Sequence, residues 1–596
     1  MNPQGLPTRD PLRLGLVLDS YEVPAWVCYL LRKLSGIEAI DLCLVVVDQS
    51  SRTTGEAIHP PFLFRLWAAL DRRIFRPPTD ALRIQDCSSL LSNSRRTPVV
   101  LRMDTSGSLH SCDLAFSIKV ANPDLLLHLG QCELPADAVS CAPMGAWFLQ
   151  ESDMEGATKV PGQFWDLYDG NCEILHGPRI IERTGNQSRI LYRSCGVNNR
   201  LSLALNQHEA YWNLAEYLAG ELSQISRSGV DAKVSVSVPV ASRSSHSRIL
   251  GNTSMAGFLV RLAKRIFVHK LRKKLFREQW RLALQPAPGT RYFGGAEVPQ
   301  YIQPTADRFY ADPFLIEKNG RTFLFFEDYR FATQKGLISC CEVDAMGNRG
   351  EPRVVLECPY HLSYPFLFEW QGEIRLIPET RDNRTIEMYK AENFPYSWTR
   401  EAVLMSDVGA ADSTLLQYQG KWWLFTAGIQ DHASPNQFLF LYYAESPKGP
   451  WTAHPKNPIV SDPRRARPAG NLYFENGRLI RPGQDCSRSY GYAVQLNRVN
   501  VLTETDYWEE PLTRITPSQM PGSLGIHTMN QSMKHQVIDA MFMLPRFQFS
   551  SLFMRWLIPA NQRDPRGMHT VTGFAPRDAI SEAAKLLARE GERKLR

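Results

Sequence analysis

"ADPFLIEKNGRTFLFFED", residues 311–328, recurs with changes as "SYPFLFEWQGEIRLIPET" (363–380) and "ADSTLLQYQGKWWLFTAG" (411–428). Each copy joins two β-type runs, rich in apolar and aromatic residues, through a dipeptide that ends in glycine. One residue in each copy, which we call the marker, lies eight positions before that glycine: Asp312, Tyr364 and Asp412. Asn-Gly and similar dipeptides between such runs are typical of β-hairpin turns. The sequence therefore predicts three equivalent hairpins.

Two weaker copies follow, at 466–485 with Arg467 as the marker and at 525–542 with His527 as the marker. The five markers are spaced 52, 48, 55 and 60 residues apart. Self-similarity at this period, with several strands in each unit, is typical of a β-propeller. We therefore predict an all-β five-bladed propeller over residues 291–555. A β-helix is the alternative, but its repeats are usually shorter.

The markers are expected to lie at one level of the innermost strands, facing the central channel. The framework around them repeats because every blade packs in the same way, whereas the markers differ from blade to blade. A purely structural ring would carry similar, often apolar side chains, so the mixed chemistry favours a ligand site. The alternative is that the aspartates cap turns or pair with Arg467.

Two carboxylates across such a channel can act as acid and base, or as nucleophile and acid, on a glycosidic bond. We predict three catalytic candidates: Asp312, Asp412 and Glu379, whose apolar strand "IPET" would raise its pKa. Four further residues are predicted to bind the substrate: Tyr364, Arg467, His527 and Asp328. No metal is predicted, because no residue with metal-ligand spacing accompanies His527.

Residues 291–545 resemble the N-terminal propeller domain of plant glucosamine inositolphosphorylceramide transferases and their bacterial relatives. The resemblance lies in "FYADPFLIEKNGRTFLFFED", "YPFLFEWQGEIRLIPET", "ADSTLLQYQGKWWLF", "GPWTAHPKNPIVSDPRRARPAG" and "SLGIHTMN". In the plant enzymes the transfer chemistry belongs to a separate C-terminal domain. We do not expect that activity here, because the 596 residues leave no room for such a domain.

The same segment resembles, more distantly, the five-bladed glycoside hydrolase family 43. That resemblance implies that Asp312, in its "ADP" context, is the base. The second acid of those hydrolases falls in blade two, where this chain has Tyr364. The departure argues against simple hydrolysis.

Residues 12–225 alternate apolar runs with helical patterns, which predicts a Rossmann-type α/β domain with a mostly parallel sheet covered on both faces. Strands are expected at 12–18, 40–48, 123–130 and 188–194, and helices at 24–36 and 201–225. No GxGxxG follows the first strand, which argues against a classical dinucleotide site.

This region is similar in its order of segments to the formyltransferase N-terminal fold, through "PDLLLHLG", "SCAPMGAWFLQESD" and "GQFWDLYDGNCEILHG". Those enzymes use an Asn-x-His pair, but Phe148 and Gln150 occupy the matching positions here. Formyl-tetrahydrofolate is therefore a cofactor only under an alternative reading, in which this domain transfers a formyl or acyl group to an amino sugar. No other cofactor is predicted.

Residues 226–290 are predicted to be a linker with a basic amphipathic helix, because residues 256–281 hold nine Lys and Arg residues and one acid, Glu278. The helix could lie on an anionic membrane surface, as a peripheral contact. The favoured alternative is a connecting helix that packs on a domain and leaves its basic face in solvent. Residues 556–596 are predicted to be a charged tail.

The remaining composition is that of a globular protein, with 43% hydrophobic residues and a net charge of +7. The charge does not gather on an aromatic-studded basic face, so we expect no nucleic-acid partner. The N-terminus has no signal-peptide pattern and no run reaches membrane-spanning length, so we expect a cytoplasmic protein, or one peripheral to the inner face of the membrane.

The sequence thus predicts a carbohydrate-active protein of glycan or glycoconjugate biosynthesis, either a transferase or a glycosidase-like enzyme, with its site in the propeller channel. The expected partner is a sugar, a nucleotide sugar or a glycolipid head group. The alternatives are the formyl or acyl transferase described above and a non-catalytic glycan-binding or scaffold protein.

Overall fold

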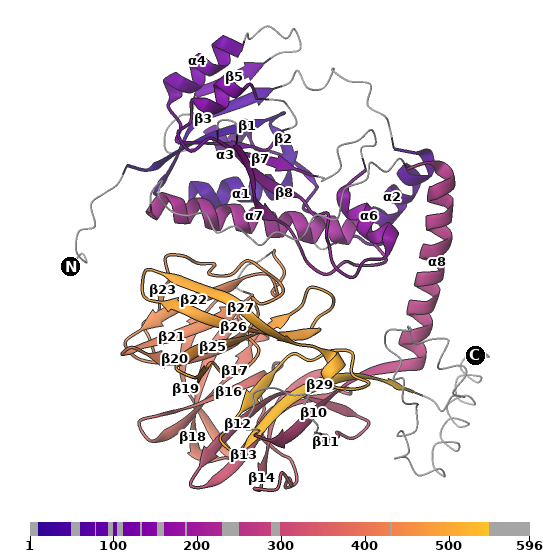
Figure 1. Ribbon diagram of the computed structural model, residues 1–596, viewed down its shortest axis with the longest axis vertical. Helices are drawn as coiled ribbons and strands as arrows, with labels where there is room; N and C mark the ends of the chain where they lie inside the picture. The colour runs from indigo at the N-terminus through magenta and orange to yellow at the C-terminus, as the bar shows by residue number, and fades with distance from the viewer. Residues whose placement is uncertain are drawn as a thin grey trace. The chain divides into compact units, whose positions relative to one another are not determined.

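The computed structural model describes residues 10–48, 60–77, 79–92, 99–103, 111–130, 134–151, 160–184, 187–228, 250–287, 299–428 and 432–546. The chain divides into two compact units, Met1–Leu544 and Pro545–Arg596. The first unit holds an α/β domain and a propeller (Figure 1). The Ser- and Val-rich start of the predicted linker, from 229, and the predicted tail from 556 lie outside the described residues.

The α/β domain is built on a seven-stranded sheet whose first five strands are parallel and whose last two are antiparallel. In spatial order the strands are β5 (Val99–Met103), β3 (Ile40–Asp48), β1 (Leu12–Leu18), β6 (Leu125–His128), β7 (Ala146–Gln150), β8 (Arg179–Thr184) and β9 (Gln187–Arg193). A small two-stranded sheet joins β2 (Glu22–Pro24) and β4 (Ile84–Asp86).

Helices cover both faces of the large sheet, so successive side chains of β1 are buried on opposite sides. Leu16 packs in the cluster that includes α1 and α7, whereas Val17 packs with α4 and α5. This two-sided burial explains why the central strands read as continuous apolar runs. The helices are α1 (Ala25–Ser35), α2 (Phe62–Ile74), α3 (Ser88–Ser92), α4 (Ser111–Ala121), α5 (Ala136–Ser140), α6 (Gly162–Asp169) and α7 (Leu203–Ser228). The predicted α/β domain is therefore confirmed.

The second half of the chain forms five four-stranded sheets, which confirms the predicted five-bladed propeller. Blade 1 holds β12 (Arg308–Lys318), β13 (Arg321–Arg330), β14 (Lys335–Val343) and β15 (Arg353–Leu356). Blade 2 holds β16 (Ser363–Trp370), β17 (Glu373–Thr380), β18 (Thr385–Asn393) and β19 (Ser397–Ser406). Blade 3 holds β20 (Ala411–Tyr418), β21 (Lys421–Ala427), β22 (Leu439–Ala444) and β23 (Thr452–Ala453). Blade 4 holds β24 (Tyr473–Glu475), β25 (Arg478–Asp485), β26 (Ala493–Leu502) and β27 (Tyr507–Ile515).

Blade 5 combines strands from the two ends of the propeller sequence: β28 (Met529–Gln531), β29 (His535–Pro545), β10 (Phe276–Pro286) and β11 (Gln300–Ile302). Strand β10 lies within the range predicted as a linker, so the propeller begins at Phe276 rather than at 291. The basic run that continues from the preceding helix into β10 hid this strand. The ring thus closes through hydrogen bonding between strands far apart in the sequence, which leaves no gap between first and last blades.

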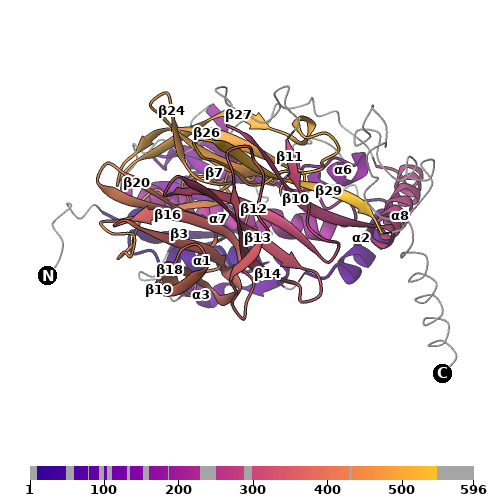
Figure 2. The ribbon, with the colours of Figure 1, turned by 90° about the horizontal axis from the view of Figure 1, so that it is seen from below.

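The predicted turns are present where β12, β16, β20 and β24 turn back. Asn319-Gly320, Gln371-Gly372, Gln419-Gly420 and Asn476-Gly477 all have positive φ at both residues. This is the backbone of a type I′ turn, whose twist matches that of the flanking strands. Strand β12 packs beside β16, and β16 packs beside β20, which Figure 2 shows from below.

Helix α8 (Asn252–Leu275) connects the two domains and runs directly into β10. Its first half packs on α2 and α6 through Phe258 and Leu262, which are buried in one cluster with Trp67 and Phe164. Packing on a domain is what the connecting-helix reading predicts for this segment. Among the described helices, none combines the length and the apolar character needed to cross a membrane.

Candidate functional site

The three strongest markers share an unusual backbone conformation. Asp312, Tyr364 and Asp412 have φ values of 49°, 44° and 51°, and the register of each hairpin shifts at the marker. Positive φ is uncommon outside glycine and recurs at functional sites and at bulges. The repeated phrase in the sequence is therefore a repeated β-bulge at the same end of each innermost strand.

The bulges point backbone N–H groups at carboxylates, and each such contact joins two neighbouring blades. The Asp412 N–H donates to Glu379 Oε2 at 3.1 Å, from blade 3 to blade 2. The Tyr364 N–H donates to Asp312 Oδ2 at 3.2 Å, from blade 2 to blade 1. The Asp312 N–H donates to Asp539 Oδ2 at 3.0 Å, from blade 1 to blade 5. The carboxylates near the axis thus hold the ring of blades together.

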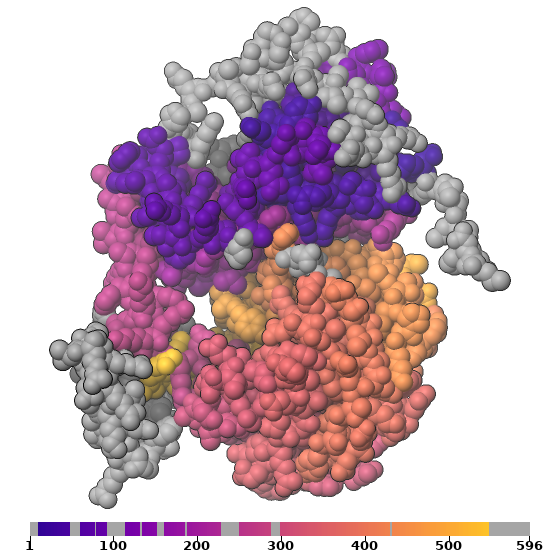
Figure 3. Space-filling view, turned by 180° about the vertical axis from the view of Figure 1, so that it is seen from behind, coloured from indigo at the N-terminus to yellow at the C-terminus, as the bar shows by residue number. Residues whose placement is uncertain are grey.

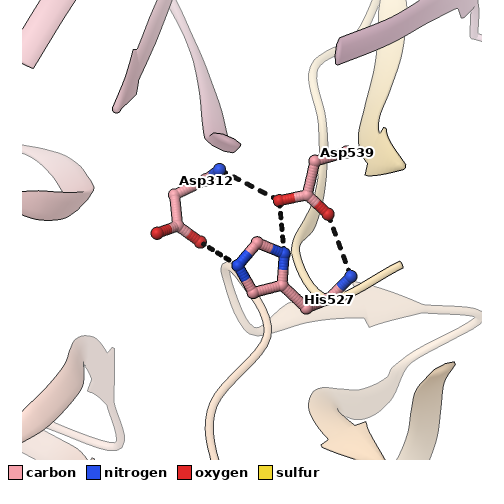
Figure 4. Close-up of side chains that lie close together, drawn as sticks. All are labelled: Asp312, His527 and Asp539. Carbon is pink, nitrogen blue, oxygen red and sulfur yellow. Dashed lines mark hydrogen bonds and ion pairs between the residues drawn. The ribbon is translucent and has the colours of Figure 1, made fainter. Parts of the chain in front are cut away.

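His527 lies between two of these carboxylates, as Figure 4 shows. Its Nδ1 is 2.6 Å from Asp539 Oδ2 and its Nε2 is 3.4 Å from Asp312 Oδ1. Burial alone would lower the pKa of His527, but the charges of Asp539 and Asp312 raise it to about 9. His527 is therefore an imidazolium at neutral pH.

One donor atom from each of Asp312, His527 and Asp539 lies within 4.8 Å of the others, so the three residues could in principle hold a metal ion. A metal-bound imidazole must be neutral. Here both ring nitrogens already face carboxylates, which fits a protonated ring better than a metal ligand. Sequence spacing did not reveal this grouping, because Asp539 comes from the second strand of blade 5.

On the far side of the ring, Arg467 forms an ion pair with Asp412. Arg467 Nε donates to Asp412 Oδ2 at 2.5 Å, and its Nη2 lies 3.4 Å from Glu379 Oε2. Gln484 Nε2 also donates to Asp412 Oδ2, at 2.8 Å. The guanidinium carbon lies 5.1 Å from the centroid of the Tyr490 ring. Asp412 thus accepts three hydrogen bonds, two from Arg467 and one from Gln484.

The ring holds more acids than cations, and burial raises the pKa of three of its carboxyl groups. Burial, reinforced by the charge of Asp412 and opposed by Arg467, raises the pKa of Glu379 to about 8. Burial also raises the pKa of Asp312 to about 6, against the lowering effect of His527. Burial and the charges of Asp312 and Glu379 hold the pKa of Glu327 well above its usual value. The site thus contains a protonated acid and a largely ionised one at neutral pH.

Tyr364 lies beneath this charged layer and has no exposed surface. Its hydroxyl lies 2.8 Å from Thr414 Oγ1 and accepts the Gly470 N–H at 2.8 Å, while its ring meets Phe314 edge-on at 4.8 Å. These contacts tie blade 2 to blades 1, 3 and 4. The structure therefore places Tyr364 as a packing residue of the ring, and its predicted contact with substrate stays a prediction.

Asp328 is not brought together with the other predicted site residues. It is paired instead with Arg308 Nη1 at 3.3 Å and accepts a hydrogen bond from Ser339 Oγ at 3.2 Å. Burial and the charges of the ring raise the pKa of its neighbour Glu327. The two residues have different surroundings because successive side chains of a strand point to opposite faces. In the antiparallel hairpin Glu327 pairs with Ala311, beside the bulge. Pairing the two strands outward from the Asn319-Gly320 turn would therefore have selected Glu327.

Two aromatic residues beside the ring were not predicted. Trp280 of β10 lies with its ring centroid 4.2 Å from that of His527, and Tyr490 lies 5.5 Å from it. Tyr490 is 45% exposed, more than any marker, so it marks the side from which solvent reaches the ring. The sequence feature that could have pointed to Tyr490 is its place in the segment after β25, the second strand of blade 4.

The same end of the propeller contacts the α/β domain. Asn436, between β21 and β22, accepts a hydrogen bond from Arg467 Nη1 at 3.3 Å. The next residue, Gln437, is bonded to Asn213 of α7 and to Tyr192 of β9, both at 3.4 Å. Phe438 belongs to the buried core cluster of the α/β domain. A short chain of contacts thus connects Arg467 with the α/β domain.

The α/β domain does not present a formyltransferase pair at the predicted positions. Phe148 is largely buried and packs on His128, with centroids 5.0 Å apart. Gln150 accepts a hydrogen bond from Arg179 Nε at 2.7 Å. Neither Phe148 nor Gln150 can act as the base that formyl transfer requires, and the binding of formyl-tetrahydrofolate stays a prediction.

Comparison with known proteins gives a family match that falls on the propeller. Residues 296–539 match the family model described as glucosamine inositolphosphorylceramide transferase 1, N-terminal. The protein of that name from Oryza sativa subsp. japonica is 40% identical over 208 residues, which are 34% of this chain and 28% of the relative. The Arabidopsis thaliana protein is 36% identical over 208 residues, 34% of this chain and 27% of the relative.

Solved structures also match, at low identity. Zg3597, a family 117 glycoside hydrolase from Zobellia galactanivorans, is 14% identical with a TM-score of 0.30, over 51% of this chain and 98% of that chain. An exo-β-1,3-galactanase from Clostridium thermocellum is 11% identical with a TM-score of 0.27, over 34% of this chain and 48% of that chain. This chain spans little more than a quarter of the length of its plant relatives. The predicted resemblance to the N-terminal domain of glucosamine inositolphosphorylceramide transferases is confirmed for residues 296–539, and the resemblance of the first domain to formyltransferases stays a prediction.

Proposed function

We propose that the marker ring is a sugar site of a glycoconjugate-assembly protein. In this site Glu379 donates a proton to the substrate and Asp312 accepts one from it as a glycosidic bond is made or broken. The observation that carries the proposal is the gathering of Asp312 and Glu379 at the bulges of the marker ring, where burial raises their pKa to about 6 and about 8. Pairs of carboxyls whose environments push their pKa values apart are typical of acid and base assignments.

In this scheme Glu379 is the acid. It is protonated at neutral pH and can donate its proton to a leaving oxygen. Asp312 is ionised through most of the neutral range and can take a proton from an attacking hydroxyl or stabilise positive charge at the sugar carbon. His527 and Asp539 position Asp312 through the contacts drawn in Figure 4.

Recognition would rest on Arg467 and the aromatic residues at the ring. Arg467 is a planar guanidinium of the kind that binds a phosphate or an acidic sugar, and its pairing with Asp412 fixes its position in the ring. The exposed face of Tyr490 suits stacking on a sugar ring. The names of the plant relatives contain an amino sugar and a phosphorylated inositol lipid, so we propose an amino sugar, its nucleotide form or an inositol phosphate head group as the ligand.

The test is a binding and turnover panel with the full chain. Amino sugars, nucleotide sugars and inositol phosphates are offered to wild type, Asp312→Asn and Glu379→Gln, and formyl-tetrahydrofolate is included as the rival ligand. We expect one sugar class to bind wild type, and turnover of that ligand to be lost in both variants while binding is retained.

A matched control is available in the same propeller. Arg481 and Glu509 form a second buried ion pair, with Arg481 Nη2 2.7 Å from Glu509 Oε1, which belongs to β25 and β27 rather than to the marker ring. Glu509→Gln should weaken folding without abolishing sugar binding in the folded fraction. Binding of formyl-tetrahydrofolate alone, unaffected by the ring variants, would overturn the proposal. If a sugar binds and no turnover is seen, the chain is a sugar-binding protein and the proton-transfer scheme is wrong.

A further inference from the structure

Helix α2 exposes a row of large apolar side chains on one face. Phe62, Leu66, Leu70 and Ile74 are 61%, 58%, 52% and 63% exposed. Their spacing of four residues puts them one above another along the helix. An adjoining face is already used, because Phe64 and Trp67 are buried in the core against α6 and α8. The helix is thus apolar on two sides, and only one of them is needed for packing.

One flank of this exposed face is basic. Arg65, Arg72, Arg73 and Arg76 are all exposed beside the apolar row. The single acid of α2, Asp71, is buried on the inner side, where it accepts the Ala204 N–H at 2.8 Å. No negative charge of α2 therefore offsets the arginines at the surface.

Helix α8 adds a second surface of the same character beside the first. The two helices pack against each other through Trp67 and Phe258, whose ring centroids are 5.2 Å apart. Val260 and Phe267 of α8 are 71% and 61% exposed. Four exposed lysines lie on the same helix: Lys264, Lys270, Lys273 and Lys274. Figure 3 shows α2 and α8, in indigo to magenta, next to each other at the surface.

We propose that the exposed faces of α2 and α8 form a docking surface for an anionic lipid bilayer. Large apolar side chains between arginines and lysines suit the boundary between head groups and acyl chains, where the apolar residues enter and the cations meet lipid phosphates. The surface extends the membrane contact considered for residues 256–281 to a helix that carries more exposed apolar residues than α8.

Charge complementarity decides between this occupant and others. A second copy of the chain would bring its own arginines against these arginines in a symmetric contact, which repels. Single-stranded nucleic acid binds through stacked aromatic platforms in a basic groove, whereas the α2 row is mainly aliphatic. An anionic bilayer satisfies both the apolar row and its basic rim.

The test measures sedimentation of the full chain with lipid vesicles. Vesicles of phosphatidylcholine alone are compared with vesicles that also contain phosphatidylglycerol, at low and high salt. We expect the chain to bind the mixed vesicles, and this binding should weaken as salt increases. In Leu66→Ser/Leu70→Ser the partition coefficient should be lower by about tenfold or more. Arg65→Glu/Arg73→Glu should abolish the preference for phosphatidylglycerol.

The control is Phe116→Ser/Val120→Ser, where the two residues are 68% and 66% exposed on α4, a helix that contains no arginine. This variant should bind as wild type does, and thermal unfolding should be unchanged in all three variants. Equal binding of wild type and both α2 variants would overturn the proposal. So would a wild-type dimer in solution that Leu66→Ser/Leu70→Ser dissociates, since the surface would then be an interface between copies.

Discussion

The backbone N–H of Asp312 in the first blade donates to the carboxylate of Asp539 in the last blade, at 3.0 Å. This hydrogen bond links blades 1 and 5 near the axis, just as β10 closes blade 5 at the level of the sheets. The same carboxylate holds the His527 imidazolium. One buried aspartate thus serves both the closure of the propeller and the electrostatics of the candidate site.

Asp539→Asn should destabilise the propeller, because it leaves an imidazolium and a backbone donor with a weaker partner in a buried place. Breaking a buried pair typically costs about 3–5 kcal/mol, and the loss should appear as a lower thermal midpoint of the propeller. The pKa of His527 should fall in the same variant, which NMR titration of the imidazole would measure. Glu351→Gln, at an exposed position of blade 1, should change the free energy of unfolding by less than about 0.5 kcal/mol.

Stability should fall as pH rises from about 4.5 to about 8. The folded protein keeps the Glu379 proton up to a pKa of about 8, whereas the unfolded chain releases it near 4.5. Between these values the folded state binds more protons, so the free energy of unfolding decreases with pH, by up to about 1.4 kcal/mol per pH unit. Denaturant unfolding across this window should show a shallower slope in Glu379→Gln. An unchanged slope would mean that Glu379 is ionised in the folded protein.

Turnover of a sugar ligand should follow a bell-shaped pH profile. The rate should fall on the basic side as Glu379 loses its proton, near pH 8, and on the acidic side as Asp312 gains one, near pH 6. Asp312→Asn should lower kcat by about 10²–10⁴-fold. If Glu379→Gln changes the rate but the fall of the rate near pH 8 stays the same, Glu379 is not the proton donor.

Arg467→Lys should not preserve ligand binding. Arg467 uses separate nitrogens for Asp412, Glu379 and Asn436, and a lysine ammonium cannot reproduce that planar arrangement. We expect binding of the sugar ligand to weaken by about tenfold or more, as titration calorimetry would measure, because charge alone is retained. Equal affinity in the two proteins would show that only the positive charge matters.

The hairpin turns offer a test of the repeat itself. Gly420 has φ of 79° and open space around a Cβ, so Gly420→Ala adds backbone strain without a clash and should cost about 1 kcal/mol of stability. Gln419→Asn, at φ of 51°, should have the opposite sign, by a few tenths of a kcal/mol, since asparagine tolerates this conformation better. Chemical denaturation of the two variants would compare them directly.

The predictions that succeeded rest on local chemistry. Turns such as Asn319-Gly320 demand positive φ, and the apolar run of β1 demands burial on both faces, so hairpins, repeat and parallel sheet can be read from neighbouring residues. Strand β10 was missed because its sequence continues the basic pattern of α8, and it is a strand because it pairs with β11 and β29.

The sequence by itself determined that related hairpin units follow one another along the chain and that their markers differ in chemistry, because turn geometry and strand periodicity are properties of adjacent residues. Only the tertiary structure decided which carboxyls meet. Asp539 and Asp312 are far apart in the chain and come together through ring closure, whereas Asp328 and Glu327 are adjacent and separate because the strand alternates. The displaced pKa values of Glu379 and Asp312 have the same origin, since burial and the distances between charges exist only once the blades have packed.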